Sequence, residues 1–184
     1  MEHLATGVSL RPATEDERPA LENLVELYCY DWSELSHLDV REDGRFAALE
    51  LAQYWRDDWR HPFVLVVEEK FAGFALILER SRLTGTSGVF DMAEFFVMRR
   101  YRRQGVGRAA AFSAFDRFRG PWEVRQRQEN PAATGFWRSV IGEYTDGRYL
   151  ETPVATTEWI GVVQTFSTRS ERIRAHTPGR SGGG

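Results

Sequence analysis

Near its middle the chain reads Val97-Met98-Arg99-Arg100-Tyr101-Arg102-Arg103-Gln104-Gly105-Val106-Gly107-Arg108. A β-rich run ends here, a turn of arginines and glycines follows, and an Ala- and Phe-rich helical segment begins. Gly105 and Gly107 have no Cβ, so a ligand can approach the backbone closely. The first N–H groups of a helix have no partner within the helix, and the helix dipole adds positive potential there. Residues 97–108 therefore predict a phosphate-binding turn between a strand and a helix.

The composition excludes several other kinds of protein. The chain has 184 residues and a formal net charge of −3, which suits one domain and does not favour a nucleic-acid partner. Lys70 is the only lysine among 24 basic residues and no GxxxxGK[ST] pattern occurs, so a phosphate-loop NTPase is excluded. Cys29 is the only cysteine and the four histidines are scattered, so neither a disulfide framework nor a metal site is expected. We see no signal peptide and no membrane-spanning run, and we expect a cytoplasmic protein without a membrane partner.

Hydrophobic periodicity predicts alternating strands and helices. Strands are expected at residues 8–11, 63–67, 71–78, 89–98, 122–128, 149–155 and 159–166. Helices are expected after the capping box Thr14–Glu17, at 46–59, at 108–118 and from Pro131 onward, with Pro62 ending the second of them. This order indicates an α+β fold of the three-layer α/β type, with a mixed central sheet of six or seven strands and about four flanking helices. We expect one domain over residues 1–166 and a flexible tail over 167–184, where apolar residues nearly vanish.

The central stretch resembles the signature of the GNAT superfamily of N-acetyltransferases, [QR]-x-x-G-x-[GA], which Arg102–Gly107 matches. Upstream, Val97, Tyr101 and Arg102 fit the run V-x-P-x-Y-R, although Arg99 stands where proline is common. Downstream, Asn130, Ala133 and Phe136 fit the pattern N-x-x-A-x-x-[FL]-Y, and Trp137 replaces its tyrosine. The resemblance runs from about Val8 to Phe166. It implies a GNAT-like sheet, acetyl-CoA as co-substrate, and transfer of the acetyl group to a primary amine of a small molecule or peptide by direct attack in a ternary complex.

The resemblance also implies a cofactor site. The amides from Arg103 to Arg108 would bind the pyrophosphate of acetyl-CoA, with arginine side chains near the adenosine phosphates. The strand before the loop would splay from its neighbour, and its freed backbone would pair with pantetheine. Asn130 would orient pantetheine, or would simply cap the next helix. The cofactor-binding candidates are Phe96, Val97, Arg102, Arg103, Gln104, Gly105, Val106, Gly107, Arg108 and Asn130.

Two residues are the catalytic candidates. Glu94 is the candidate base for the acceptor amine, because partial desolvation on a strand would raise its pKa; the alternative is a strand residue that faces solvent. The thioester carbonyl would be polarised by a backbone N–H near Val97. The family's tyrosine, the usual general acid, falls at Trp137, whose indole cannot donate a proton at neutral pH. Tyr144 is the candidate in its place, with Tyr101 and water as alternatives.

The sequence does not decide the chemical class of the acceptor. Asp31 and Glu34 lie in an aromatic segment and could hold a cationic amine, or Asp31 could cap a helix while the aromatic rings pack inside. Arg125, with Arg127, could instead favour an acidic acceptor, so Asp31, Glu34 and Arg125 are all candidates and the acceptor stays open.

Two other functional classes agree with parts of the sequence. A non-catalytic acyl-CoA-binding or sensor domain is the alternative function, because the loop is intact while the usual tyrosine is missing. Nucleic-acid binding is disfavoured, because the arginine cluster coincides with the phosphate loop and no aromatic-rich strand signature of RNA readers is present. A homodimer is left open.

Overall fold

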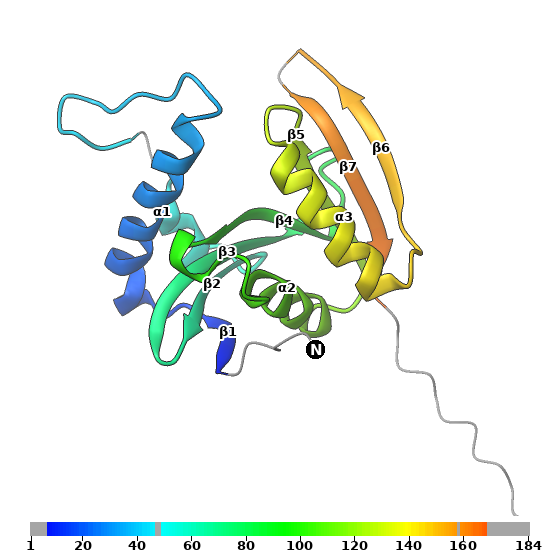
Figure 1. Ribbon diagram of the computed structural model, residues 1–184, viewed down its shortest axis with the longest axis horizontal. Coiled ribbons are helices and arrows are strands. Elements are labelled where there is room, and N and C mark those ends of the chain that lie inside the picture. The colour runs from blue at the N-terminus through cyan, green and yellow to red at the C-terminus, as the bar shows by residue number, and fades with distance from the viewer. Residues whose placement is uncertain (1–6, 47–48, 158, 169–184) are drawn as a thin grey trace, which may run out of the picture.

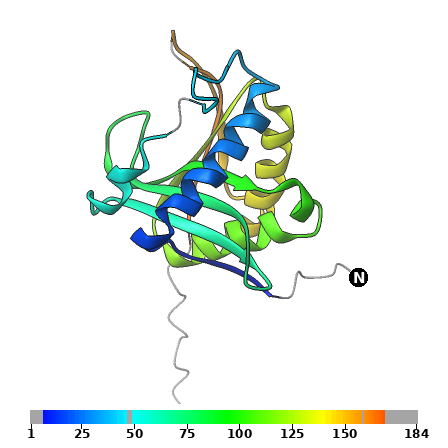
Figure 2. The same ribbon diagram turned by 90° about the vertical axis from the view of Figure 1, so that its left-hand side faces the viewer.

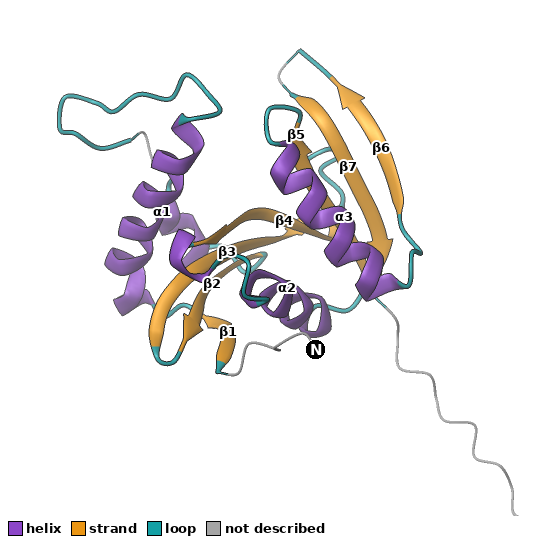
Figure 3. Cartoon of the chain, viewed as in Figure 1, coloured by secondary structure: helices purple, strands orange, loops and turns teal. Residues whose placement is uncertain are grey.

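The computed structural model describes residues 7–46, 49–157 and 159–168, which form one mixed sheet with helices on both faces (Figures 1 and 3). Seven strands lie in the order β1-β2-β3-β4-β5-β7-β6, which confirms the predicted mixed sheet. The strands are β1 (Val8–Pro12), β2 (Arg60–Val67), β3 (Lys70–Arg80), β4 (Ser87–Val97), β5 (Pro121–Arg127), β6 (Leu150–Ala155) and β7 (Ile160–Ser167). The α-helices are α1 (Arg18–Ser33), α2 (Val106–Arg117) and α3 (Pro131–Thr145). None of the helices in the described part of the chain is long and apolar enough to cross a membrane.

The core has two layers, one on each face of the sheet. Helix α1 covers one face with Leu21 and Val25, both fully buried, as Figure 2 shows by the position of α1 across the strands. Helices α2 and α3 cover the other face, where Phe115 and Ile141 are fully buried. Strands β2 and β3 are buried on both sides, which explains their nearly continuous apolar sequence.

The helix starts follow from local capping. The carboxylate of Glu17 accepts a hydrogen bond from the N–H of Thr14 at 3.0 Å, and the predicted capping box is present ahead of α1. The Oδ1 of Asn130 accepts a hydrogen bond from the N–H of Ala133 at 3.0 Å, with Pro131 in the first turn of α3. These two caps set the directions in which α1 and α3 leave the sheet.

Strands β4 and β5 separate after a short parallel contact. They pair only at Phe90↔Trp122, Asp91↔Glu123 and Met92↔Val124, although β4 continues to Val97 and β5 to Arg127. The rest of the sheet is antiparallel and pairs over longer registers. The sheet therefore opens between the C-terminal ends of β4 and β5, visible as a diverging pair in Figure 1.

A β-bulge lies where this opening begins. The β3–β4 register shifts from Leu76↔Glu94 to Ile77↔Met92, so Ala93 is the extra residue. A bulge lets two consecutive side chains point to one face of the sheet. Ala93 and Glu94 therefore both point toward the α1 face, the same side as Asp91.

The predicted helix at 46–59 is wrong. The structure has a short 3-10 helix at Leu51–Trp55, and positions 47 and 48 lie outside the described residues. Tertiary hydrogen bonds hold this segment instead: the N–H of Phe46 donates to Glu26, and the indole of Trp55 donates to the carbonyl of Ala13. The described chain thus has three α-helices rather than about four.

Two other predicted element boundaries differ from the observed ones. Strand β2 begins before Pro62. Proline has no N–H, and none is needed here because β1 ends opposite Phe63 and has no carbonyl paired with position 62. At the C-terminus β7 runs to Ser167 and Thr168 is buried, so the first two residues of the expected tail belong to the fold. The remainder of that tail, 169–184, lies outside the described residues.

Candidate functional site

The turn before α2 has the backbone shape expected of an anion site. Gly105 has a φ of 75° and Arg103 a φ of 59°, both in the left-handed region. In a turn with such residues, successive backbone N–H groups can face a shared concavity, and the N-terminus of α2 adds its own N–H groups there. Gly107 is needed for packing, because a Cβ at this position would meet the ring of Phe136 at 3.2 Å.

Several side chains of this loop bind other parts of the protein. The Nε of Arg102 donates to the carbonyl of Val97 at 2.7 Å, and the Nε2 of Gln104 donates to the carbonyl of Arg100 at 2.7 Å. The guanidinium of Arg108 forms an ion pair with Glu143, while Val106 is buried in the core. What these loop residues present to a ligand is therefore mainly their backbone.

The backbone N–H and C=O groups of Phe96 and Val97 point in opposite directions. The N–H of Met98 donates to the carbonyl of Ala72 on β3 at 2.8 Å. Because a strand alternates its hydrogen-bonding direction, the backbone of Phe96 also faces β3, whereas that of Val97 faces the opening beside β5. The side chain of Phe96 is only 5% exposed. The structure therefore directs Val97, and not Phe96, toward the gap.

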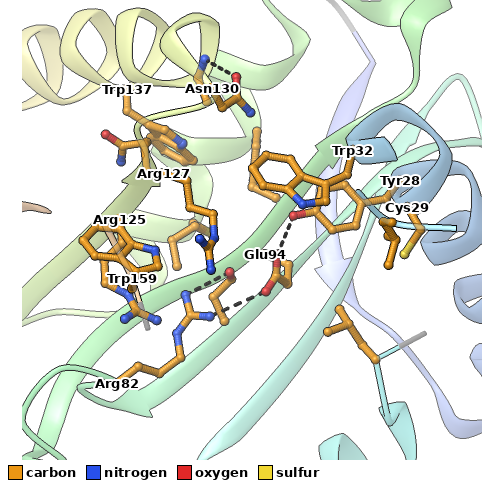
Figure 4. A pocket seen from close by; sticks show the side chains of 17 residues that line it. Tyr28, Cys29, Trp32, Arg82, Glu94, Arg125, Arg127, Asn130, Trp137 and Trp159 are labelled. Atoms are coloured by element: carbon orange, nitrogen blue, oxygen red, sulfur yellow. Dashed lines mark hydrogen bonds and ion pairs between the residues drawn. The ribbon is translucent and has the colours of Figure 1, made fainter. Parts of the chain in front are cut away.

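A cavity of about 460 Å³ passes through the opening between β4 and β5. From the α1 side it is lined by Tyr28, Cys29, Trp32, Leu38 and Leu49, and from the α3 side by Asn130, Ala133 and Trp137. The remaining lining comes from the sheet, its neighbouring loops and Trp159 (Figure 4): Arg82, Met92, Ala93, Glu94, Phe95, Arg125, Gln126, Arg127 and Trp159. Its volume suits a small molecule.

Glu94 lies on the wall of this cavity. Its Oε2 accepts a hydrogen bond from the hydroxyl of Tyr28 at 2.6 Å, and its Oε1 lies 3.5 Å from Nη1 of Arg82, as Figure 4 shows. Burial raises the pKa of Glu94 above its ordinary value, although the charge of Arg82 and the hydrogen bond from Tyr28 oppose the rise. Such a carboxylate is a suitable proton acceptor near neutral pH.

Arg82 and Asp91 form an ion pair behind Glu94. The Nε of Arg82 lies 2.9 Å from Oδ2 of Asp91, and its Nη2 lies 3.0 Å from Oδ1. The Nη2 of Arg82 also donates to the carbonyl of Ala93 at 2.9 Å, which holds the bulge. Asp91 is fully buried, and the Nε of Arg125 lies 3.7 Å from its Oδ2.

Asp31 and Glu34 do not line the cavity. Asp31 forms ion pairs with Arg99, at 2.8 Å, and with Arg102. Partial burial would raise the pKa of Asp31, but the hydrogen bonds from Arg102 and Arg99 outweigh it and lower that pKa. Glu34 is largely exposed and lies 4.0 Å from Arg99. Both predicted acceptor ligands thus face the arginines of the phosphate loop.

Tyr144 also lies away from the cavity. Its hydroxyl donates to Asp116 at 2.8 Å and its ring packs edge-on against Phe112 and Phe115, between α2 and α3. Burial and the hydrogen bond with Asp116 raise the pKa of Tyr144 to about 12. The structure brings Glu94 and Arg125 together at one cavity and does not bring Tyr144 there. Trp137, by contrast, lines the cavity and is 5% exposed.

Sequence reasoning missed Arg82, Asp91 and Trp159. Arg82 lies in a loop rich in Ser, Thr and Gly, which carries no chemical pattern of its own. Asp91 is an acidic residue in an apolar strand, and this interruption of the pattern was the one available signal. Trp159 reaches the cavity only because β7 lies beside β5, a pairing between segments far apart in the sequence.

Comparison with known proteins was made for both sequence and structure. A search of curated protein sequences finds no significant match. The fold is similar to an acetyltransferase from Thermus thermophilus, with a TM-score of 0.63 and 13% identity over 89% of this chain and 98% of that chain. It is also similar to the spermidine N-acetyltransferase from Vibrio cholerae in complex with CoA and spermine (TM-score 0.59, 13% identity, 89% and 96% covered). A third is the ribosomal-protein-S18-alanine N-acetyltransferase from Escherichia coli (TM-score 0.56, 14% identity, 92% and 99% covered).

At these identities the structural similarities show the fold. The family follows from the sequence itself, since a family model described as acetyltransferase (GNAT) family matches residues 23–142, well over half of the chain. The phosphate-binding turn predicted from residues 97–108 lies within that match. The chain therefore belongs to the acetyltransferase (GNAT) family.

Proposed function

We propose that this acetyltransferase moves an acetyl group from acetyl-CoA to the primary amine of a small molecule or peptide, by direct attack in a ternary complex. One observation carries the proposal: the cavity that contains Glu94 passes through the gap between β4 and β5. A donor that enters from the α2 and α3 side and an acceptor that enters from the α1 side would meet beside this carboxylate.

The residues on the donor side fit acetyl-CoA. The left-handed turn at Gly105 and the first N–H groups of α2 would bind its pyrophosphate. The backbone of Val97 faces the gap and would pair with pantetheine, although its carbonyl is now covered by Arg102. Asn130 lines the cavity while it caps α3, so it can serve both purposes expected of it.

Glu94 acts on the acceptor. It takes a proton from the bound ammonium group, and the neutral nitrogen then attacks the thioester carbon. The N–H of Val97 would stabilise the charge that develops on the carbonyl oxygen. As the carbon–sulfur bond breaks, the nitrogen loses its second proton to water, the amide forms, and the CoA thiolate takes up a proton. Glu94 then returns its proton to solvent, so that each turnover releases one proton overall.

The proton for the thiolate comes from water in this proposal. Tyr144 donates its hydroxyl to Asp116, and the indole of Trp137 is not an acid at neutral pH. Because a CoA thiolate is a good leaving group, the reaction does not require a strong acid in the protein.

A non-catalytic acyl-CoA-binding domain is the competing function, favoured by the tryptophan at position 137. The test combines thermal unfolding with a free-thiol assay. CoA at about 100 times its dissociation constant should stabilise the protein by roughly 2.7 kcal/mol. A panel of primary amines should then release thiol from acetyl-CoA. CoA binding without thiol release from any amine would favour the binding domain, and the absence of CoA binding would refute both.

A further inference from the structure

The charges that line the cavity are mostly positive. Among the described residues that line it, the ionised side chains are one carboxylate, Glu94, and three guanidinium groups, Arg82, Arg125 and Arg127. Figure 4 shows Arg127 reaching toward Glu94 and Arg125 lying beside Trp159. A polyamine would need several carboxylates, so this wall does not suit a polycation.

Arg82 and Arg125 share a single buried counter-ion. Asp91 accepts two hydrogen bonds from the guanidinium of Arg82, one on each oxygen, and a third from the backbone N–H of Arg82 on Oδ2. Arg125 reaches the same carboxylate only at 3.7 Å, beyond hydrogen-bond distance. Glu123, two residues before Arg125 on β5, accepts a hydrogen bond from Ser81 at 2.7 Å. The ion-pair geometry around Asp91 therefore serves Arg82 and leaves Arg125 poorly compensated.

Arg125 is buried without a full set of partners. Its side chain is only 13% exposed, and its Nε has no hydrogen-bond partner among the residues that the structure describes. Burial and the neighbouring charge of Arg82 lower the pKa of Arg125. A buried guanidinium whose charge is poorly compensated is costly unless a ligand supplies a negative charge beside it.

Arg125 and Glu94 face the same side of the gap. Trp122 and Val124 pack into the core under α2 and α3, so alternation along β5 turns Arg125 to the opposite face. The bulge at Ala93 turns Glu94 to that face as well. Glu94 and Arg125 therefore lie on one face of the sheet and line the same cavity.

We propose that the acceptor is a free amino acid with an apolar or aromatic side chain, whose carboxylate binds Arg125 while its α-amine faces Glu94. This inference rests on the proposed acetyl transfer and names its substrate class. The opposite charges of the ligand match the two wall groups, and a guanidinium–carboxylate pair would supply the negative charge that Arg125 shares only partly with Asp91. Trp32, Leu38 and Trp159 provide the apolar walls for the side chain.

The test compares amino acids with their amides in the free-thiol assay. L-phenylalanine and L-phenylalaninamide have nearly the same size and both carry an α-amine, but only the acid has a carboxylate; leucine and leucinamide form a second pair. We expect kcat/KM to favour the acids by about 10- to 100-fold, the ratio that one charge-assisted hydrogen-bonded pair supplies. Spermidine, a polycation, should be a poorer acceptor than either acid.

Arg125→Gln should reduce this preference. The kcat/KM for the acid should fall much more than that for the amide. Arg125→Lys should retain part of the preference for the acid because it keeps the charge. Arg138→Gln is the control, since Arg138 pairs with Glu151 on β6 and does not line the cavity. This variant should leave kcat/KM for both acceptors unchanged. Should Arg125→Gln fail to fold, the acid-to-amide ratio of the unaltered protein still decides.

The outcomes separate two kinds of failure. Acetylation of amides or spermidine in preference to amino acids, or of other amines but no amino acid, would overturn the carboxylate site alone. A protein that acetylates no amine, whether or not it binds CoA, would overturn the acetyl transfer on which the inference rests.

Discussion

Glu94→Gln should remove the base while keeping the shape of the site. The amide has the same size, and its oxygen can still accept the hydrogen bond that the hydroxyl of Tyr28 donates at 2.6 Å. The amide cannot take a proton from the acceptor. The α-amine of a free amino acid, with a pKa near 9, is neutral in only about one molecule in a hundred at pH 7. We therefore expect kcat to fall by about 10²-fold at pH 7, within the usual range for loss of a general base.

The deficit should depend on pH. Each unit of rising pH makes the free amine about tenfold more neutral, so the loss should shrink by roughly that factor per unit and nearly vanish by pH 10. The assay is thiol release under saturating acetyl-CoA and acceptor from pH 6 to 10, with CoA affinity measured by thermal shift. CoA affinity should stay the same, because the carboxylate acts on the amine.

A matched control makes the result interpretable. Glu123→Gln makes the same chemical change on the same face of the sheet, but Glu123 is bound to Ser81 and does not line the cavity. It should leave kcat unchanged. An unchanged kcat in Glu94→Gln, or a deficit that is equal at every pH, would refute the role of Glu94 as a base.

Three further predictions concern the base, the loop and the fold. Tyr28→Phe removes a hydrogen bond that lowers the pKa of Glu94, so the acid limb of the kcat profile should move up by about 1–2 pH units; a limb that stays in place would contradict this. Gly105→Val places a branched residue at a φ of 75° and should weaken CoA binding at least about tenfold, measured by titration, whereas Gly85→Val, at a φ of 73° in open space, should not. The hydrogen bond from Arg11 holds the pKa of Glu17 at about 2, so its stabilisation is present above about pH 4.5 and is lost as the pH falls toward 2. Glu17→Gln should lower the free energy of unfolding by about 1 kcal/mol at pH 6 in urea titrations, since this ion pair is partly exposed, and equal losses at pH 6 and pH 2.5 would disprove the linkage.

Local patterns predicted the elements that depend on local physics. The turn at Gly105, the caps at Thr14 and Asn130, and the strands expected at 63–67 and 71–78 all follow from short-range rules, and all are present. The expected helix at 46–59 is reduced to the 3-10 helix Leu51–Trp55, and hydrogen bonds to the distant residues Glu26 and Ala13 hold this segment. Sequence alone does not show such partners.

Only the site residues close to the central stretch, residues 97–108, could be predicted from the sequence. Glu94 adjoins the decisive stretch, so its place near the gap followed from chain order. Trp159 reaches the cavity through the pairing of β7 with β5, segments far apart in the sequence, and Arg82 reaches it from the connection between β3 and β4. The bulge at Ala93 could not be foreseen either, because it depends on the register with β3. Without that register, no pattern distinguishes the arginine that meets Asp91 from the many others in the chain.

The diverging strands give β4 an uneven exposure to solvent exchange. Amide hydrogens of Phe96 and Met98 point to β3 and should exchange slowly with deuterium, while that of Val97 points into the gap and should exchange quickly. Neighbouring residues of one strand would then differ by orders of magnitude in protection. The rapidly exchanging amide lies where pantetheine is proposed to pair. Hydrogen exchange can therefore report cofactor binding: a bound donor should slow the exchange of the Val97 amide and leave that of Phe96 unchanged.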